Sequence, residues 1–296
     1  MQGIVIPIAM GSGSSFIHRI NPLAKLIWVI GIMIFSFSTR NPVILFGLTL
    51  LGLVLVWIAG IQRPFFRVML ILFPISASLI VFQSLAPAFP RPWTPIAELG
   101  PFTIYQEGIY SGLSLLARAL VMTVWALVAL MTTHPSDLFV SLQRIGMPYV
   151  LNFMLTMTLQ LIPLLQREFS IVLSAQKSRG MKSTGFGALL PSMVPVFAGA
   201  IERVQQLSIS LESRAFGSSG VKTSYRQIST RPTDYVIGAA GILFTVVGVG
   251  AMILTGGLDW SQTLIFPPIV AIMLVLLATA IFIAFTATAI LVVIRA

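Results

Sequence analysis

Cysteine is absent from this 296-residue chain, and histidine occurs only twice. The lack of cysteine excludes a disulfide framework, a thiolate metal site and a cysteine nucleophile. Two histidines leave little for a histidine-ligated metal cluster. Charged residues are also scarce, at 9% of the chain, whereas 57% of the residues are hydrophobic. Because a single core of this length cannot bury so much apolar surface, these proportions exclude a water-soluble domain.

Catalytic and nucleotide-binding motifs are missing as well. The sequence has no Gly-x-x-x-x-Gly-Lys-Ser/Thr phosphate loop, so we expect the chain neither to bind nor to hydrolyse ATP itself. The thirteen methionines are scattered through apolar stretches, where thioethers commonly fill packing gaps, and we do not interpret them as metal ligands. We therefore expect a protein that is not an enzyme and holds no cofactor of its own.

Six stretches are long and apolar enough to cross a bilayer, whose hydrocarbon core requires about 20 residues of helix. They are residues 23–39, 42–60, 65–86, 108–132, 234–256 and 264–294. The apolar stretch 4–10 is too short to span and is not preceded by a basic segment, so we expect the N-terminus to be retained. The pattern predicts an all-α, polytopic membrane protein with about six transmembrane helices.

Basic residues flank and separate these stretches, which explains the net charge of +10 without nucleic acid. If the N-terminus is cytoplasmic, fifteen of the eighteen Lys and Arg residues fall on the cytoplasmic side. Only Arg40 and Arg91 fall outside, and Arg118 lies within the fourth span. Because Lys and Arg are retained on the cytoplasmic side, we expect both termini to be cytoplasmic in a multi-pass protein of the cell membrane.

A segment of about a hundred residues separates the fourth and fifth spans and carries ten of the eighteen cations. A helix-start signal at 133–137 precedes a short amphipathic helix that ends at Gly146. Two longer helices are predicted at 147–179 and 187–214. The sequence thus predicts three regions. They are a membrane region at 1–132, a cytoplasmic helical region at 133–232 and a second membrane region at 233–296.

The second of the long helices is amphipathic. Its apolar residues recur every three or four positions, at Leu190, Val194, Phe197, Ile201, Val204, Leu207 and Leu211. This spacing predicts one face against a helix or a lipid boundary and the other face in water. Three acidic residues of the long helices, Glu168, Glu202 and Glu212, are expected to be solvated or paired with Arg167, Arg203 and Arg214.

The two long helices end alike, with Ser178-Arg179-Gly180 in the first and Ser213-Arg214-Ala215 in the second. Arginine in a last turn is favoured by the negative end of the helix dipole, and a small residue after it lets another chain approach closely. Each guanidinium offers a planar fork of donors to carboxylates and carbonyls, so two such ends could engage two copies of a partner. The alternative is ordinary C-cap chemistry.

Arg118 lies near the middle of the fourth predicted span, where an unpaired charge costs at least ~2.5 kcal/mol. We expect no acidic partner for it within the spans. The side chain must then bond carbonyls or hydroxyls, face a partner subunit, or reach toward water. Near the first span, His18 and Arg19 are interpreted as a juxtamembrane anchor rather than a site.

At three places the sequence resembles the transmembrane T component (EcfT/CbiQ family) of energy-coupling factor (ECF) transporters. Residues 18–26 resemble the family's opening His-Arg-Leu-Asp-Pro-x-x-Lys-Leu, with Asn21 in place of the usual Asp. Residues 133–138 with 146–148 resemble its Thr-x-Pro-x-Asp-Leu and Gly-x-Pro motifs. The two helix ends resemble its paired Ala-Arg-Gly motifs, with serine in place of alanine in both and Ala215 in place of the second glycine.

The resemblance implies an ABC-type importer for a vitamin or a transition-metal ion. Its other parts are two cytoplasmic ABC ATPases, as a homo- or heterodimer, which bind ATP and magnesium, and a small membrane-embedded substrate-binding S component. The implied ATPase-coupling residues are Ser178, Arg179, Gly180, Ser213, Arg214 and Ala215. The implied surface toward the S component comprises Leu190, Val194, Phe197, Ile201 and Val204, and Arg118 is a further candidate for that interface.

Two other functions compete with this interpretation. A stand-alone permease or channel would bind solute between its helices and would need polar residues converging at mid-membrane, where only Arg118 qualifies. A membrane enzyme acting on lipid would need catalytic acids or histidines at the interface. Residues 134–137 are the one candidate for such chemistry, and a helix start explains them more simply.

Overall fold

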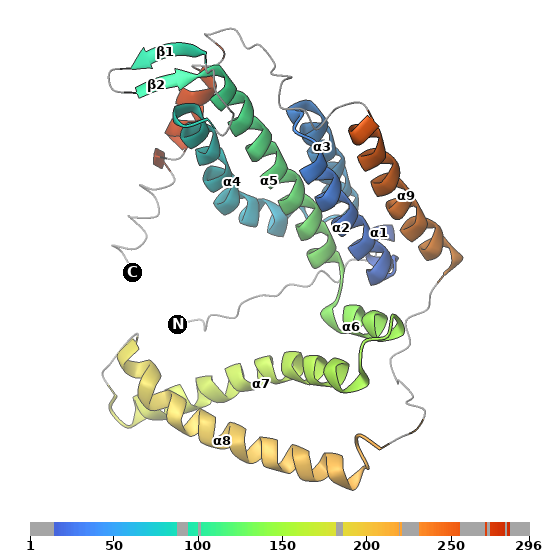
Figure 1. Ribbon diagram of the computed structural model, residues 1–296. Coiled ribbons are helices and arrows are strands. Elements are labelled where there is room, and N and C mark those ends of the chain that lie inside the picture. The colour runs from blue at the N-terminus through green and yellow to red at the C-terminus, as the bar shows by residue number, and fades with distance from the viewer. Residues whose placement is uncertain are drawn as a thin grey trace. The chain divides into compact units, whose positions relative to one another are not determined.

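The computed structural model describes residues 15–87, 94–99, 102–181, 186–218, 220, 231–254, 270, 273–281 and 283–284 (Figure 1). These residues form two compact units. The bundle unit contains the described residues before 135 together with those from 231 onward. The hairpin unit contains the described residues from 135 to 220. The predicted short stretch 4–10, Arg91 and most of the predicted sixth span lie outside the described residues.

Five long helices of the bundle unit coincide with five of the six predicted spans. They are α2 (Pro22–Ser38), α3 (Pro42–Ala59), α4 (Gln62–Leu85), α5 (Gln106–Thr132) and α9 (Pro232–Leu254), and one turn, α1 (Phe16–Arg19), precedes them. By length and composition α3, α4, α5 and α9 can each cross a membrane, as can the less apolar helix α7 (Tyr149–Ser178) outside the bundle, whereas α2 is apolar but has only 17 residues. Helical residues 273–281 fall within the sixth predicted span. The all-α, polytopic prediction is confirmed.

Two Asn-Pro pairs start neighbouring helices of the bundle. Asn21 and Asn41 are the N-cap residues of α2 and α3, and proline follows each of them. The side-chain oxygen of each asparagine accepts a hydrogen bond of 3.0 Å from the amide two residues further on. Asparagine thereby satisfies an amide at the helix start, and proline has no amide hydrogen to leave unpaired there. The second pair separates α2 from α3, at the boundary between the predicted spans 23–39 and 42–60.

Helix α5 packs closely against α4 because glycine lines their contact. A Cβ atom added to Gly108 would lie 2.2 Å from the Gln83 carbonyl oxygen. One added to Gly112 would lie 2.7 Å from the Ile80 Cα atom. Both distances are shorter than a van der Waals contact with backbone, so a larger residue at either position would force the two helices apart.

Aromatic rings join α2, α5 and α9. Trp28 of α2 stacks with Trp125 of α5 and with Phe244 of α9, at centroid distances of 6.1 Å and 5.6 Å. The Trp28 indole Nε1 also donates a hydrogen bond of 2.9 Å to the Ile237 carbonyl oxygen. These contacts hold α9 against α2, although about 200 residues separate the two in sequence.

A short β-hairpin lies in the connection between α4 and α5. Strand β1 (Pro95–Leu99) pairs antiparallel with β2 (Phe102–Tyr105). Next to it, Thr94 donates through its amide and its hydroxyl to the two carboxylate oxygens of Glu107, at 3.0 Å and 2.7 Å. The sequence did not predict these strands because runs of four and five residues are too short for alternation to be distinctive.

The hairpin unit consists of α6 (Pro135–Arg144), α7 (Tyr149–Ser178) and α8 (Phe186–Ser213). After α6 the chain turns at Gly146, whose φ of 105° suits glycine, as predicted. Phe216, just after α8, packs on Tyr149 and Phe153 at the start of α7, with ring centroids 5.6 Å and 4.5 Å apart. Helices α7 and α8 are therefore antiparallel. Their predicted boundaries are confirmed to within two residues.

Candidate functional site

The end of α7 is a Schellman cap. Arg179 is the C-cap residue, and Gly180 follows it in the left-handed region with φ of 89°. The Gly180 amide donates to the Lys177 carbonyl oxygen at 3.0 Å, and the Met181 amide donates to the Gln176 carbonyl oxygen at 3.2 Å. This pair of hydrogen bonds satisfies two carbonyls that the helix itself leaves unpaired.

The end of α8 has the same cap geometry, with alanine in place of glycine. Arg214 occupies the C-cap position, and Ala215 follows it with φ of 54°. The Ala215 amide donates to the Glu212 carbonyl oxygen at 2.9 Å, and the Phe216 amide donates to the Leu211 carbonyl oxygen at 2.9 Å. Alanine in this region costs roughly 1–2 kcal/mol, which glycine avoids. The small residue after each arginine thus has a backbone reason, and the C-cap chemistry that the sequence left open as an alternative is found at both helix ends.

All six residues of the two caps are exposed in the described structure. The Ser178 hydroxyl donates to the Ser174 carbonyl oxygen at 3.1 Å, and the Ser213 hydroxyl donates to the Ser210 carbonyl oxygen at 2.9 Å. Both serines are therefore turned back onto their own helices. Within the described ranges neither cap arginine forms an ion pair, so each guanidinium has donors to offer to a partner.

The two caps lie at opposite ends of the hairpin formed by α7 and α8. Arg179 ends α7, whereas Arg214 precedes Phe216, which packs on the first turns of α7. A helix of 30 residues such as α7 is about 45 Å long, because each residue adds 1.5 Å. One small pocket cannot accept both guanidiniums, so they suit two separate binding sites.

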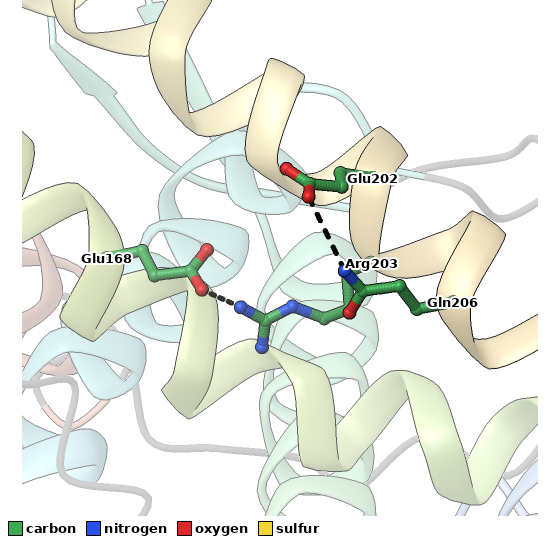
Figure 2. Close-up of polar contacts among 4 residues, drawn as sticks. All are labelled: Glu168, Glu202, Arg203 and Gln206. Carbon is green, nitrogen blue, oxygen red and sulfur yellow. Dashed lines mark hydrogen bonds and ion pairs between the residues drawn. The ribbon is translucent and has the colours of Figure 1, made fainter.

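An ion pair between Arg203 of α8 and Glu168 of α7 joins the middle of the hairpin (Figure 2). In the same view Glu202 accepts a hydrogen bond of 3.4 Å from Gln206 on its own helix. Glu202 and Glu212 are exposed, as the solvated alternative predicted. Glu168 is paired, but with Arg203 and not with Arg167, because adjacent residues on a helix point in different directions. The pair that forms is only half-buried, so we expect it to fix the alignment of the helices more than their stability.

The apolar row predicted on α8 faces away from α7. Its first five members, Leu190, Val194, Phe197, Ile201 and Val204, have side chains between 58% and 74% exposed. Leu207 and Leu211 further along are half-buried. The row is therefore not covered by the neighbouring helix of its own hairpin. A contiguous row of large apolar side chains is typical of a surface that contacts a protein or a lipid.

Arg118 is bonded within the bundle unit. Its Nε donates to the Ser36 carbonyl oxygen and one terminal nitrogen donates to the Thr39 carbonyl oxygen, each at 2.9 Å. The guanidinium also lies over the Phe37 ring, 5.4 Å from its centroid. Of the three alternatives left open by the sequence, carbonyl bonding is the one found. Arg118 thereby satisfies the C-terminal carbonyls of α2, where a cation is also favoured by the helix dipole.

A cavity of about 460 Å³ lies within the bundle unit between α1, α2, α3, α5 and α9. Its lining is apolar and includes Trp28, Ile32 and Phe244. Among the described residues that line this cavity, Lys25 is the one charged residue. Such a lining suits an apolar occupant better than a strongly hydrophilic solute.

Three polar residues at the start of the bundle form contacts that the sequence did not predict. The Lys25 ammonium donates to the carbonyl and hydroxyl oxygens of Thr132 and to the hydroxyl of Thr133. The Asn21 backbone amide donates to an Asp234 carboxylate oxygen at 3.1 Å. In the sequence Asn21 and Lys25 stand out only as residues of the opening motif at 18–26, and nothing distinguishes Asp234.

These observations define a helical, multi-pass membrane protein whose exposed helical hairpin ends in two arginine caps. A family model described as cobalt transport protein, CbiQ, matches residues 13–225. The chain therefore belongs to the CbiQ/EcfT family of ECF transporter transmembrane components. This is a family of transporter membrane subunits.

Proteins named "energy-coupling factor transporter transmembrane protein EcfT" are among its relatives. The one from Leuconostoc gelidum subsp. gasicomitatum is 29% identical over 260 residues, covering 79% of this chain and 92% of the relative. The one from Staphylococcus aureus is 28% identical over 237 residues, covering 75% and 88%. A "putative ABC transporter ATP-binding protein" of Bifidobacterium longum is 26% identical over 249 residues, covering 79% of this chain but 32% of that longer protein.

Proposed function

We propose that this chain couples ATP hydrolysis in partner subunits to the movement of a substrate-binding membrane subunit during import of a vitamin or a transition-metal ion. The observation that carries this proposal is the pair of matching, exposed arginine caps at opposite ends of the hairpin. Closure of two motor subunits, each holding one cap, would move the hairpin as a lever. ATP and magnesium would bind to those partners and not to this chain.

Two ABC ATPases, identical or related, are the proposed partners of the caps. Guanidinium donors suit carboxylates and backbone carbonyls at the base of a groove. The similarity to a Bifidobacterium protein that is named as an ABC ATP-binding protein supports an association between this membrane component and such an ATPase. The predicted excess of cations in the hairpin region favours a cytoplasmic location, where these ATPases would lie.

A small membrane S component is the proposed partner of the apolar row on α8. The exposed row of Leu190, Val194, Phe197, Ile201 and Val204 would be covered by that subunit and by lipid. Recognition of the substrate would then belong to the S component. The apolar lining of the bundle cavity supports this division of roles over a stand-alone permease.

Charge reversal at both caps tests the proposal. The double variant Arg179→Glu, Arg214→Glu leaves the cap hydrogen bonds in place, because they involve only backbone atoms. We expect ATPase co-purification and substrate uptake to fall at least tenfold. Arg167→Glu is the matched control, since Arg167 is an exposed arginine of α7 outside the cap. Unchanged co-purification and uptake in the double variant would show that the caps do not bind the ATPases.

A further inference from the structure

In the described part of the chain, the residues that lead out of the bundle to the hairpin unit and back lie beside the first turn of α2. One connection follows Thr132 and Thr133 at the end of α5, and the hairpin unit begins at Pro135. The other precedes α9, which begins at Pro232. Force carried along these two connections enters the bundle at these two points.

The outgoing connection is bonded to Lys25. Its ammonium donates to the Thr132 carbonyl oxygen at 2.9 Å and to the hydroxyls of Thr132 and Thr133 at 3.2 Å each. Lys25 and Thr132 are only 9% and 4% exposed. A buried ammonium is costly unless its donors are satisfied, so these oxygens fix the end of α5 to α2.

The first turn of α9, where the chain returns to the bundle, is bonded to Asn21. One Asp234 carboxylate oxygen accepts from the Asn21 amide at 3.1 Å, and the other accepts from the Arg231 amide at 2.9 Å. Asp234 and Asn21 are 9% and 5% exposed. The same carboxylate thus bonds the residue before α9 and joins α9 to the N-cap residue of α2.

We propose that Asn21, Lys25, Thr132, Thr133 and Asp234 form a mechanical anchor that transmits movement of the hairpin unit to the whole membrane bundle. Without it, a pull on either connection would unwind the nearest turn of α5 or α9 instead of moving the bundle. This inference rests on the proposed coupling function. Lys25 and Asp234 act as positioning residues, because they act through the helix ends that they hold.

The test uses the complete transporter, with both ATPases and the S component, in proteoliposomes. The variants are Lys25→Met, which keeps an apolar stem of similar length, and Asp234→Asn, which keeps the shape of the side chain. In each we expect ATPase co-purification and ATP hydrolysis within twofold of the wild type, and substrate uptake per ATP hydrolysed at least fivefold lower. Lys25→Arg, which restores a cationic donor, should recover at least half of the uptake per ATP that Lys25→Met loses.

Ser114→Ala is the matched control. The Ser114 hydroxyl donates a 2.7 Å hydrogen bond to the Arg40 carbonyl oxygen, beyond the opposite end of α2. Its loss should leave uptake per ATP unchanged. An equal fall in this control, or an unchanged ratio in both anchor variants, would overturn the anchor.

Whether the transporter assembles distinguishes failure of the anchor from failure of the proposed function. If Lys25→Met does not assemble, the isosteric Asp234→Asn alone decides about the anchor. Failure of the wild-type chain to bind ATPases would instead overturn the proposed function, because that measurement does not depend on the uptake ratio.

Discussion

The bundle unit and the hairpin unit use their cations in opposite ways. In the bundle, Arg118 and Lys25 donate to carbonyls and hydroxyls of their own chain. In the hairpin, Arg179 and Arg214 are exposed at helix ends whose carbonyls are already bonded to backbone amides. The comparison teaches that a cation near a helix end has two uses. It can satisfy the helix itself, or it can be left over for a partner once the backbone has satisfied the helix.

Loss of Arg118 should give the largest effect on stability. Arg118→Met would leave the Ser36 and Thr39 carbonyls without their donors, at a cost of about 1–3 kcal/mol each. Arg179→Met should change the free energy of unfolding by less than about 0.5 kcal/mol, because the side chain is exposed. Denaturant titration of both variants in detergent measures the difference. Equal destabilisation would mean that the two cations do not differ as described.

The span pattern and the helix ends were predictable because their causes are local. Long apolar runs predict the helices of the bundle, Asn-Pro pairs predict two of their starts, and Gly180 predicts the end of α7. The helix cap at Ala215 was visible only through its likeness to the first cap. Alanine alone gives no signal for a left-handed residue.

Contacts between distant residues were not predictable, because periodicity and capping carry no information about them. Lys25 lies 107 residues from Thr132, and Asn21 lies 213 residues from Asp234. The ion pair between Arg203 and Glu168 spans 35 residues. The amphipathic pattern of α8 likewise predicted an apolar face without saying that α7 packs elsewhere on the helix.

A smaller effect should separate the backbone of a cap from its arginine. Gly180→Ala places alanine at φ of 89°, which should destabilise the cap by about 1 kcal/mol. Ala215→Gly relieves the same strain in the second cap, but glycine also makes the unfolded chain more flexible. The free energy of unfolding should therefore change by no more than about 0.5 kcal/mol. Hydrogen exchange at the Met181 and Phe216 amides reports each cap.

Both variants keep their arginines, so each should retain more ATPase binding than the corresponding charge reversal. Equally slow exchange at Met181 in Gly180→Ala and in the wild type would contradict a left-handed cap there. Loss of ATPase binding in Gly180→Ala as complete as in Arg179→Glu would show that cap shape matters as much as the guanidinium.

The smallest expected effect concerns His18, which lies outside the membrane-spanning helices and near Lys25. Burial, and then the positive charge of Lys25, lower the pKa of His18 below its ordinary value of 6.5. The folded state therefore favours the neutral ring, whose Nδ1 lies 2.7 Å from the Ser15 hydroxyl and can accept from it. Stability contributed by this group is present above pH 6.5 and is lost as pH falls through the lowered pKa.

His18→Gln keeps a hydrogen-bonding side chain but cannot titrate. The melting temperature of the wild type should fall on acidification below pH 6.5, and that of the variant should fall less. Comparison of the two chains isolates His18, because all other titrating groups are shared. If the two melting curves shift in parallel, the ring is not held neutral by the bundle. Lys25 would then stabilise the end of α5 through its hydrogen bonds without affecting His18, and it would remain a cation with a purely structural role, unlike Arg179 and Arg214.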